Sequence, residues 1–593
     1  MTYRLRFANL GREIAASADD TLYQSARRGG VRIVGACGGR GACGTCVVRV
    51  VEGEVELTEE DGEPAERESL RDRQWVRACR VHARSDCTVE VAPRSLAPVV
   101  RADMASLRSG TLALDPAVRQ RELVLAPATL DDPVADLDRV ARALDCDTLS
   151  ACDAAAARQL PGILRAHAWR LRARLHGGEA IGFAAPGSRA LGLAVDLGTT
   201  NVAAFLIDLD SGIQLASLGI ENPQAAWGAD VISRLNFASR SSAGGDELRA
   251  AAVAGINALA ADLCEAVGVH GEDIVDLALC GNTAMHHLLL GLPVHQLGHA
   301  PFVAVLRDSL DIKARELGIR ACAGAYVHIA PGVGGFVGGD HVAALLGTEE
   351  IWSNAKLSIL MDIGTNTEIS LIHHGEILTA SCPSGPALEG GHISCGMRAA
   401  EGAIERVRLS DGRIAVQTIG GGKAVGVCGS GVLDAVATLH AAGIVDARGR
   451  IVEEHAAVRA GPGKREAVLA PGVSFTQDDV RAVQLAKSAI RTGVDLLLAQ
   501  AGLAESAIER FIIAGAFGAY LHVPSGVAIG LFPDLPAERF IQVGNAAGDG
   551  VRQMLASTRA RTRARTLSAR CRYVELSKIG NFQKTFLYRI AFN

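Results

Sequence analysis

The stretch LGLAVDLGTTNVAAFLID, residues 191–208, decides the fold of the larger part of this chain. It consists of two apolar strands joined by a tight turn, and the turn contains Asp196, Gly198, Thr199 and Thr200. The stretch LSILMDIGTNTEISLI, residues 357–372, repeats the pattern, and its turn contains Asp362, Gly364, Thr365, Asn366 and Thr367. Two copies of one strand-turn-strand unit predict two related half-domains.

Each turn has the chemistry of a phosphate-binding loop. Its backbone amides and hydroxyls can surround phosphate oxygens, and its aspartate, Asp196 or Asp362, can bind Mg²⁺ directly or through water. This form differs from the G-x-x-x-x-G-K-[ST] loop, which opens a helix. A single copy would be explained as well by an ordinary hairpin, but two copies predict a nucleotide held between the half-domains.

A cysteine-rich loop, VGACGGRGACGTC at residues 34–46, lies near the N-terminus. It places Cys37, Cys43 and Cys46 in a C-x5-C-x2-C arrangement, and Cys79 follows after the next strand and loop. Four thiolates can hold two irons bridged by two sulfides. The glycines of the loop allow the backbone to curl closely around such a cluster. The spacing departs from the plant-type C-x4-C-x2-C and is similar to the adrenodoxin-like variant.

Cys87 is the rival for the position of fourth ligand. Because Cys87, Val89 and Val91 share one face of a period-two strand, we expect Cys87 to pack into the core and we prefer Cys79. A zinc site is the alternative to an iron-sulfur cluster. Zinc sites commonly use two close cysteine pairs, whereas this sequence has one pair and two isolated cysteines.

The chain of 593 residues is too long for one domain, and its patterns predict a multidomain α/β protein. The expected parts are a β-rich domain at 1–94, a linker at 95–118, a small middle domain at 119–188 and a large α/β domain at 189–593. In the first we expect strands at 46–51 and 87–91 and a helix capped by Asp19 or Asp20. In the third we expect helices at 134–144 and 154–175.

Charge and hydropathy exclude several classes of function. The formal net charge is only -5, and the arginine-rich stretch at 557–572 lacks aromatic residues for base stacking, so we expect no nucleic-acid partner and interpret this stretch as a solvated helix end and connector. Arg4 and Arg6 interrupt any signal peptide, and no apolar run approaches about 18 residues, so we expect a cytoplasmic protein with no membrane partner. The 14 cysteines are then ligands or core residues.

Two further candidates come from the glycine-rich segments of the large domain. Asp340, in PGVGGFVGGD at residues 331–340, is a candidate second carboxylate beside Mg²⁺ or the attacking water. His286 and His287 begin an apolar helix, and we expect them to pack there rather than to bind a metal.

The two turns resemble the phosphate loops of the superfamily of acetate kinase, sugar kinases, heat-shock chaperone ATPases and actin. The resemblance implies a duplicated actin-like, ribonuclease H-like ATPase domain that binds ATP and Mg²⁺. It also implies that Gly515 and Gly518, in FIIAGAFGAY at residues 511–520, form a glycine turn near the adenosine. The N-terminal part resembles a β-grasp ferredoxin with a [2Fe-2S] cluster.

The order of the motifs is similar to that of the reductive activators of corrinoid proteins. The motifs after the cysteine loop are GLAVDLGTTNVAAFLID, NPQAAWGADVISRL, CGNTAMHHLLLGL, MDIGTNTEI, GMRAAEGAI, GVCGSGVLDAV and AGAFGAY. The similarity covers nearly the whole chain. It implies that one electron passes from the [2Fe-2S] cluster to the Co(II) of a corrinoid protein in a methyltransferase system, with ATP, to regenerate Co(I). An attached ATPase fits this function, because a ferredoxin needs no ATP for downhill transfer.

Other functions fit the sequence less well. A sugar or acyl kinase leaves the cysteine loop unexplained, and a chaperone-like ATPase would need a peptide-binding domain. The closest rival is an ATP-dependent electron donor to another metalloenzyme, such as an acyl-CoA dehydratase or reductase. Activators of that kind resemble homodimers that share one [4Fe-4S] cluster, which the four-cysteine pattern does not match. The upstream reductant and the oligomeric state, a homodimer included, stay open.

Overall fold

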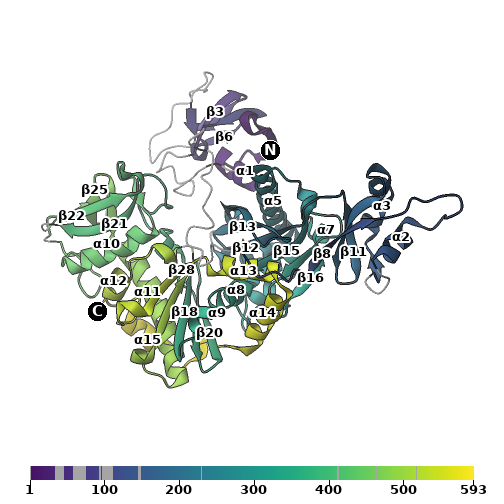
Figure 1. Ribbon diagram of the computed structural model, residues 1–593. Coiled ribbons are helices and arrows are strands. Elements are labelled where there is room, and N and C mark those ends of the chain that lie inside the picture. Colours follow the sequence, from purple (N-terminus) through teal and green to yellow (C-terminus); the bar gives the residue numbers. More distant parts are fainter. Residues whose placement is uncertain are drawn as a thin grey trace.

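In the computed structural model, the described residues are 2–31, 33, 46–57, 75–92, 95, 111–144, 149–228, 230–410, 413–453, 455–461, 464–515 and 517–592. Cys37 and Cys43 lie outside them. Figure 1 shows a ferredoxin-like domain at the top, a small middle domain at the right, and two larger bodies that we call lobe I in the centre and lobe II at the left. The predicted multidomain α/β fold class is confirmed.

The ferredoxin-like domain is a sheet of order β2-β1-β7-β3-β5 with helix α1 against it. The elements are β1 (Thr2–Phe7), β2 (Arg12–Ser17), α1 (Leu22–Arg28), β3 (Val47–Glu52), β4 (Val55–Leu57), β5 (Trp75–Arg77), β6 (Val81–Ala83) and β7 (Cys87–Val91). The strand predicted at 87–91 is confirmed. The predicted cap of α1 is wrong, because Thr21 accepts a hydrogen bond from the Gln24 amide while the Gln24 side chain accepts one from the Thr21 amide.

The small middle domain has a sheet of order β8-β10-β11-β9. Its elements are β8 (Val118–Val124), α2 (Asp136–Ala143), β9 (Ala151–Cys152), α3 (Ala154–Ala166), β10 (Arg170–His176) and β11 (Glu179–Ala184). The helix predicted at 154–175 is too long. Ala168 and Trp169 adopt positive φ angles, which end the helix, and β10 then buries every second residue at Leu171, Ala173 and Leu175.

The two lobes are built on sheets of one topology, as the duplicated turns predicted. Lobe I has the order β14-β13-β12-β15-β17-β16 and lobe II has the order β28-β27-β18-β19-β20-β29. We number five strands of each sheet from 1 to 5 in chain order: β12, β13, β14, β15 and β17 in lobe I, and β18, β19, β20, β27 and β28 in lobe II. Both sheets then contain the order 3-2-1-4-5. The strands of lobe I are β12 (Leu191–Leu197), β13 (Asn201–Asp208), β14 (Gln214–Glu221), β15 (Ile274–Gly281), β16 (Leu310–Lys313) and β17 (Tyr326–Ile329). Those of lobe II are β18 (Leu357–Ile363), β19 (Thr367–His373), β20 (Glu376–Cys382), β27 (Arg510–Ala514), β28 (Phe540–Gly544) and β29 (Cys571–Tyr573).

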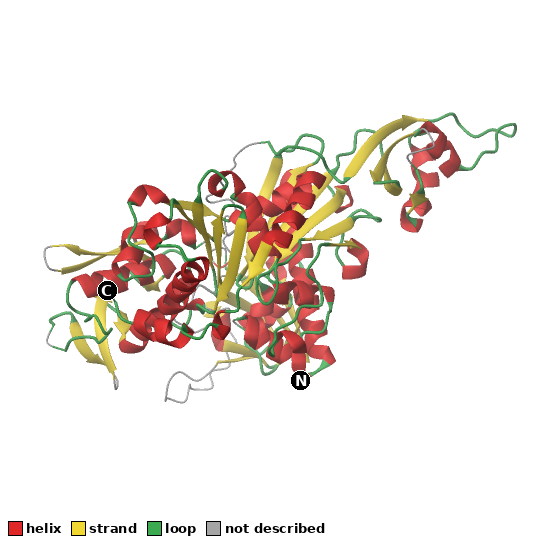
Figure 2. Cartoon of the chain, turned by 90° about the horizontal axis from the view of Figure 1, so that it is seen from below, coloured by secondary structure: helices red, strands yellow, loops and turns green. Residues whose placement is uncertain are grey.

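Helices cover both faces of these sheets (Figure 2). They are α4 (Val231–Arg240), α5 (Ser242–Val267), α6 (Thr283–Leu290), α7 (Ala314–Leu317), α8 (Gly339–Gly347), α9 (Glu349–Trp352), α10 (Gly429–Ala441), α11 (Gln477–Ala501), α12 (Val523–Ala528), α13 (Ala546–Ala556), α14 (Thr558–Arg570) and α15 (Phe582–Arg589). Lobe II also carries two small sheets, formed by β21 (Ala403–Ser410), β22 (Arg413–Thr418) and β23 (Gly426–Val427), and by β24 (Val458–Gly461), β25 (Lys464–Ala470) and β26 (Val473–Thr476).

Helix α5 corrects the expectation that no apolar run reaches membrane length. Its residues Ala243–Val267 are long and apolar enough to cross a membrane by length and composition, and half of the most apolar window is buried inside the protein. The helix contacts β13 and β14 and places Leu248, Ile256 and Leu259 in the core of lobe I. Alanines and leucines that pack on a sheet account for its high hydropathy.

The arginine-rich stretch is also different from the expected solvated connector. Helix α14 lies beside lobe I (Figure 1), and four of its five arginines have partners inside the protein. Arg561 pairs with the buried Asp276 of β15, Arg563 pairs with Glu349, and Arg565 pairs with Asp308 at 2.7 Å. Arg570 donates to the carbonyl of Gly375 in lobe II. These charged side chains therefore bind helix α14 to both lobes.

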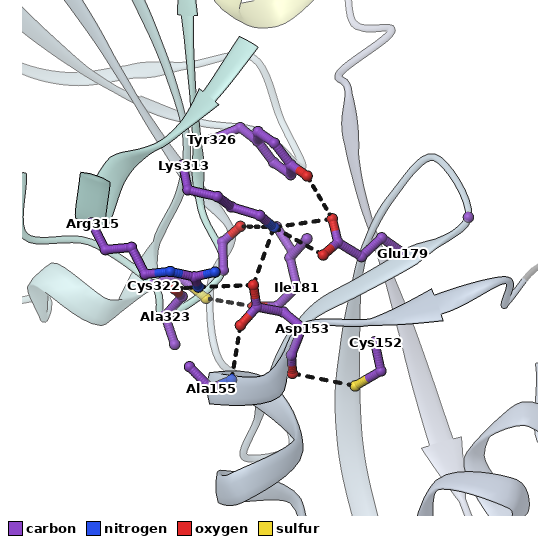
Figure 3. Close-up of polar contacts among 12 residues, drawn as sticks. Cys152, Asp153, Ala155, Glu179, Ile181, Lys313, Arg315, Cys322, Ala323 and Tyr326 are labelled. Carbon is purple, nitrogen blue, oxygen red and sulfur yellow. Dashed lines mark hydrogen bonds and ion pairs between the residues drawn. The ribbon is translucent and has the colours of Figure 1, made fainter. Parts of the chain in front are cut away.

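A cluster of charges around the buried side chains of Asp153 and Lys313 joins the small middle domain to lobe I (Figure 3). Lys313 Nζ lies 3.0 Å from both carboxylate oxygens of Glu179 and 3.3 Å from Asp153. Arg315 pairs with Asp153 at 2.8 Å, and the Tyr326 hydroxyl donates to Glu179. Asp153 also accepts from the Ala155 amide and so caps α3. Each charge has an opposite partner, as burial requires.

We expect Asp153→Ala to destabilise this junction more than Arg315→Ala. The Asp153 side chain is only 2% exposed, and its loss leaves Lys313 partly uncompensated, at a cost of roughly 3 kcal/mol. Arg315 is 48% exposed, so its loss costs roughly 1 kcal/mol or less. Urea denaturation of both variants measures the difference, and equal losses would contradict this account.

Candidate functional site

The two predicted phosphate loops meet at the centre of the large domain. Each follows the first strand of its lobe, β12 or β18, and the sheets bring their ends together. The Thr200 hydroxyl lies 2.7 Å from the Thr365 hydroxyl, so one side chain from each loop touches the other. The structure thus joins two segments that are 165 residues apart in the sequence.

Three buried polar side chains donate hydrogen bonds to the first phosphate loop. Asn222 donates to the Gly198 carbonyl at 2.7 Å, and Asn282 donates to the Thr199 hydroxyl at 2.8 Å. Arg234 donates to the Thr199 carbonyl at 2.7 Å and is fully buried, which lowers its pKa to about 10. The guanidinium therefore keeps its charge at neutral pH. Sequence analysis did not assign these three roles, although all three residues lie in the motifs quoted above.

Glycine is required where the backbone passes close to the loops. A Cβ on Gly198 would lie 2.7 Å from the Asn201 carbonyl oxygen. Gly515 has φ +95°, and its Cβ would lie 2.4 Å from the Ile363 carbonyl oxygen and 3.0 Å from the Asp362 carboxylate. The glycine turn is therefore next to the second loop, whereas Gly518 packs against Ile513 of β27.

Asp196, Asp340 and Asp362 form a group of partly buried carboxylates beside the two loops. Asp340 reaches the site because α8 begins against Asn282, where a Cβ on Gly338 would lie 2.4 Å from the Asn282 Cα. Burial raises the pKa of Asp196 to about 6. Burial, and then the charge of Asp196, raises the pKa of Asp362 to about 7.

Asp340 is the most strongly affected of these carboxylates. Burial, and then the charges of Asp362 and Asp196, raises its pKa to about 8. Glu368, which lies opposite Asp362 across β18 and β19, also has a raised pKa because of burial and the charges of Asp340 and Asp362. The site therefore contains several carboxylates whose negative charges are not balanced by neighbouring positive charges in the described part of the chain.

These residues fit Mg²⁺ bound together with a nucleotide. Within the described ranges, no Lys, Arg or His forms a salt bridge with Asp196, Asp340 or Asp362, so a cation would relieve their repulsion. The described residues hold no group of three or more His, Cys, Asp or Glu side chains that could bind a metal ion alone. Mg²⁺ commonly keeps several waters and uses one or two carboxylates plus phosphates, which agrees with this arrangement.

Glu389 is a site residue that sequence analysis missed. Its carboxylate accepts hydrogen bonds from the Thr200 and Thr365 hydroxyls, each at 3.2 Å, and so contacts both loops. Burial raises its pKa. It ends a single turn, Pro386–Glu389, in the segment SGPALEGGHISCGMRAAEG. Nothing in the spacing of that segment distinguishes this glutamate from a surface residue.

Of the four proposed cluster ligands, Cys46 and Cys79 lie in the described residues. Both are buried in the core of the ferredoxin-like domain, and the Ala78 amide donates to the Cys46 carbonyl at 2.6 Å. Cys87 is different, because its thiol donates to the carbonyls of Glu54 and Ser85 at 3.3 and 3.2 Å. Burial raises the pKa of the Cys87 thiol, which favours a protonated core residue.

His286 and His287 lie in α6 and are buried, as expected for packing residues. Burial lowers the pKa of His286 to about 3, so it is neutral. The His287 ring bonds to the Thr283 carbonyl and accepts from the Val305 amide at 2.9 Å. Both ring nitrogens of His287 are thus used inside the lobe.

Four family models match consecutive parts of the chain. They are the 2Fe-2S iron-sulfur cluster binding domain at residues 7–84, the RACo linker region at 108–189, the RACo middle region at 191–350, and the C-terminal domain of RACo, the ASKHA domain, at 356–593. The linker-region model falls on the linker and small middle domain of this chain. The other two RACo models fall on lobe I and lobe II.

Individual relatives match the same architecture. The chain is 31% identical to the corrinoid activation enzyme RamQ of Eubacterium limosum, over 99% of both chains. It is 26% identical to the [Co(II) methylated amine-specific corrinoid protein] reductase of Methanosarcina barkeri, over 60% of this chain and 68% of that relative. The solved structure of a reductive activator for corrinoid, iron-sulfur protein is 33% identical, with a TM-score of 0.73, and the match covers 100% of this chain and 98% of that one.

We expect Asp340→Asn to stabilise the protein in the absence of Mg²⁺ and nucleotide. The pKa of Asp340 in the fold, about 8, is above its ordinary value of 3.8, so the folded state binds the extra proton and stability falls as pH rises between these values. The amide carries no such penalty. Its melting temperature should exceed that of the wild type by on the order of 2 °C or more at about pH 8, and by less at about pH 5. A constant difference across this range would contradict the assignment.

Proposed function

Because this chain belongs to the family of reductive activators of corrinoid proteins, we propose that it passes one electron from its [2Fe-2S] cluster to the Co(II) of a corrinoid protein and hydrolyses ATP to do so. The observation that carries this proposal is the presence of two facing phosphate loops with partly buried carboxylates in the same chain as a ferredoxin-like domain. The product, Co(I), is the form that accepts a methyl group in a methyltransferase system.

In the ATPase domain, the two loops bind the phosphates. We assign this role to the backbone and hydroxyls of Gly198, Thr199, Thr200, Gly364, Thr365 and Asn366. Asp196 and Asp362 hold Mg²⁺, and Asp340 lies near Mg²⁺ or the attacking water. Glu389 orients the hydroxyls of both loops, since it already accepts a hydrogen bond from each. Gly515 and Gly518 leave room for the adenosine. Water attacks the γ-phosphorus, the bond to the bridging oxygen breaks, and ADP and phosphate leave.

In the ferredoxin-like domain, we assign Cys37, Cys43, Cys46 and Cys79 as ligands of the cluster. A [2Fe-2S] cluster held by four thiolates stores and releases one electron. The burial of Cys46 and Cys79 suits ligands whose sulfur atoms are withdrawn from water. The Cys87 thiol keeps its proton, which it donates in hydrogen bonds to neighbouring carbonyls, and we leave Cys87 outside the ligand set.

ATP has a thermodynamic role in this function. The reduction potential of plant-type [2Fe-2S] centres is roughly -400 mV. Transfer to an acceptor whose potential is 100 mV more negative costs about 2.3 kcal/mol per electron. Closure of lobe I on lobe II around a nucleotide supplies this energy if the closed form binds one state of the partner more tightly. The favoured state has an altered cobalt coordination that makes Co(II) easier to reduce.

The partner is a corrinoid protein of a methyltransferase system, and the reduced thiols that the cluster requires favour a cytoplasmic location. A homodimer is compatible with this function. The rival function, electron donation to an acyl-CoA dehydratase or reductase, is disfavoured because the N-terminal domain matches a [2Fe-2S] family rather than a shared [4Fe-4S] site.

We expect Cys37→Ala, Cys43→Ala, Cys46→Ala and Cys79→Ala each to abolish the cluster, and Cys87→Ala to keep it. The first four substitutions remove a thiolate ligand, whereas the fifth removes a core thiol. Iron content, at two irons per wild-type chain, and the paramagnetic signal after reduction measure the outcome. If Cys87→Ala loses the cluster while Cys79→Ala retains it, the ligand assignment is wrong.

We expect the purified protein to convert its cognate Co(II) corrinoid protein to Co(I), or to the methylated form when a methyl donor and methyltransferase are present. The reaction needs a reductant, Mg²⁺ and ATP, and absorbance follows the cobalt state. Cys43→Ala stops it by removing the electron carrier. Asp362→Ala stops it with the cluster still reducible, because ATP hydrolysis is lost. Equal reduction with and without ATP would make a regulatory role of the ATPase the better interpretation.

A further inference from the structure

Glu221 lies where the ferredoxin-like domain, lobe I and lobe II meet. It is the last residue of β14 in lobe I. Its carboxylate pairs with Arg27 of α1 in the ferredoxin-like domain and, at 2.6 Å, with Arg398 of lobe II. The Arg27 and Glu221 side chains are only 15% and 21% exposed, so water and salt screen their pairing less than that of an ordinary surface pair.

Glu221 is also directly connected to the first phosphate loop. It lies opposite Asn201, the residue after Thr200, in the pairing of β13 and β14. The next residue, Asn222, donates from its amide to the Thr200 carbonyl at 2.8 Å and from its side chain to the Gly198 carbonyl at 2.7 Å. The backbone that carries Glu221 is therefore hydrogen-bonded directly to the first phosphate loop.

Arg398 links the same carboxylate to the other half of the site. Met397, beside it, packs on Gly390, where a Cβ would lie 3.0 Å from the Met397 carbonyl oxygen. Gly390 follows Glu389, which contacts both phosphate loops. Burial raises the pKa of Glu389, and the charge of Arg398 opposes that rise. Arg398 thus lies close enough to act on Glu221 and Glu389 together.

The ferredoxin-like domain contributes more than one contact. The Arg28 guanidinium lies 5.3 Å from the centre of the Trp227 ring, a cation-π contact, and Trp227 ends the turn that begins at Asn222. Tyr23 of α1 is buried, and its pKa is raised by burial and further by the charges of Glu221 and Cys46. Helix α1 therefore lies between a proposed cluster ligand and Glu221.

We propose that Glu221 is a positioning residue for ATP-linked electron transfer. A nucleotide on the first phosphate loop fixes Asn222, and so fixes Glu221 and Trp227, which form the surface on which α1 docks. Docking in turn holds the loop in its phosphate-binding form. The two equilibria are linked, so each favours the other by the same factor. This inference rests on the proposed function for the nucleotide on the first phosphate loop and for the nature of the electron acceptor.

The test uses the full-length protein with its cluster and the Arg27→Gln variant. Its KM for ATP should rise five-fold or more, within the usual range of allosteric coupling, while kcat stays unchanged. A non-hydrolysable ATP analogue should change the Trp227 fluorescence of the wild type, and the change should be reduced in Arg27→Gln and absent in Trp227→Phe. Arg4→Gln is the matched control, because Arg4 pairs with Asp86 inside the ferredoxin-like domain.

Reversal of the charge on α1 makes a sharper change at the same position. Arg27→Glu should raise KM further than Arg27→Gln, because its carboxylate would repel Glu221. A wild-type KM and fluorescence response in Arg27→Gln would overturn the proposal, as would an equal rise of KM in the Arg4→Gln control. These measurements need no corrinoid protein, so failure of electron transfer to cobalt would leave their outcome unchanged, whereas failure of the ATPase assignment would appear as a wild-type protein that does not hydrolyse ATP.

Discussion

The mutual repulsion of three carboxylates governs the centre of this protein. Asp196, Asp340 and Asp362 lie close together and partly buried, and the two lobes meet beside them at the hydroxyls of Thr200 and Thr365. A bound cation would favour the charged forms of these carboxylates, and the phosphate groups of a nucleotide would supply further ligands for it. In the proposed function, this arrangement couples the binding of Mg²⁺ to the binding of the nucleotide.

The sequence was informative where backbone chemistry is repeated. Asp196 and Asp362 could be predicted because the same turn occurs twice between apolar strands, and the lobes follow one topology. Cys87 could be placed in the core because a strand alternates with period two. Glu389 could not be found, since its contact with both loops depends on the packing of lobe II on lobe I. Asn222, Asn282 and Arg234 were missed for the same reason, because a support residue has no spacing rule.

The errors in the fold have local physical causes. The helix expected to reach residue 175 ends at Ala166, because two residues with positive φ reverse the chain before a strand whose Leu and Ala content also suits a helix. The arginine-rich stretch was interpreted as solvated because its composition is polar. Its partners, Asp276, Asp308 and Glu349, come from segments more than 200 residues earlier, and no local pattern reveals such pairs.

Helices α13 and α14 bear on the order in which the chain acquires its structure during synthesis. Met554, Leu555 and Leu567 belong to the core of lobe I, although the rest of that core comes largely from residues before 350. During translation the sheet of lobe I is therefore synthesised long before α13 and α14, and Asp276 is synthesised long before its partner Arg561. The core of lobe I is therefore complete only when translation of the 593 residues is nearly finished.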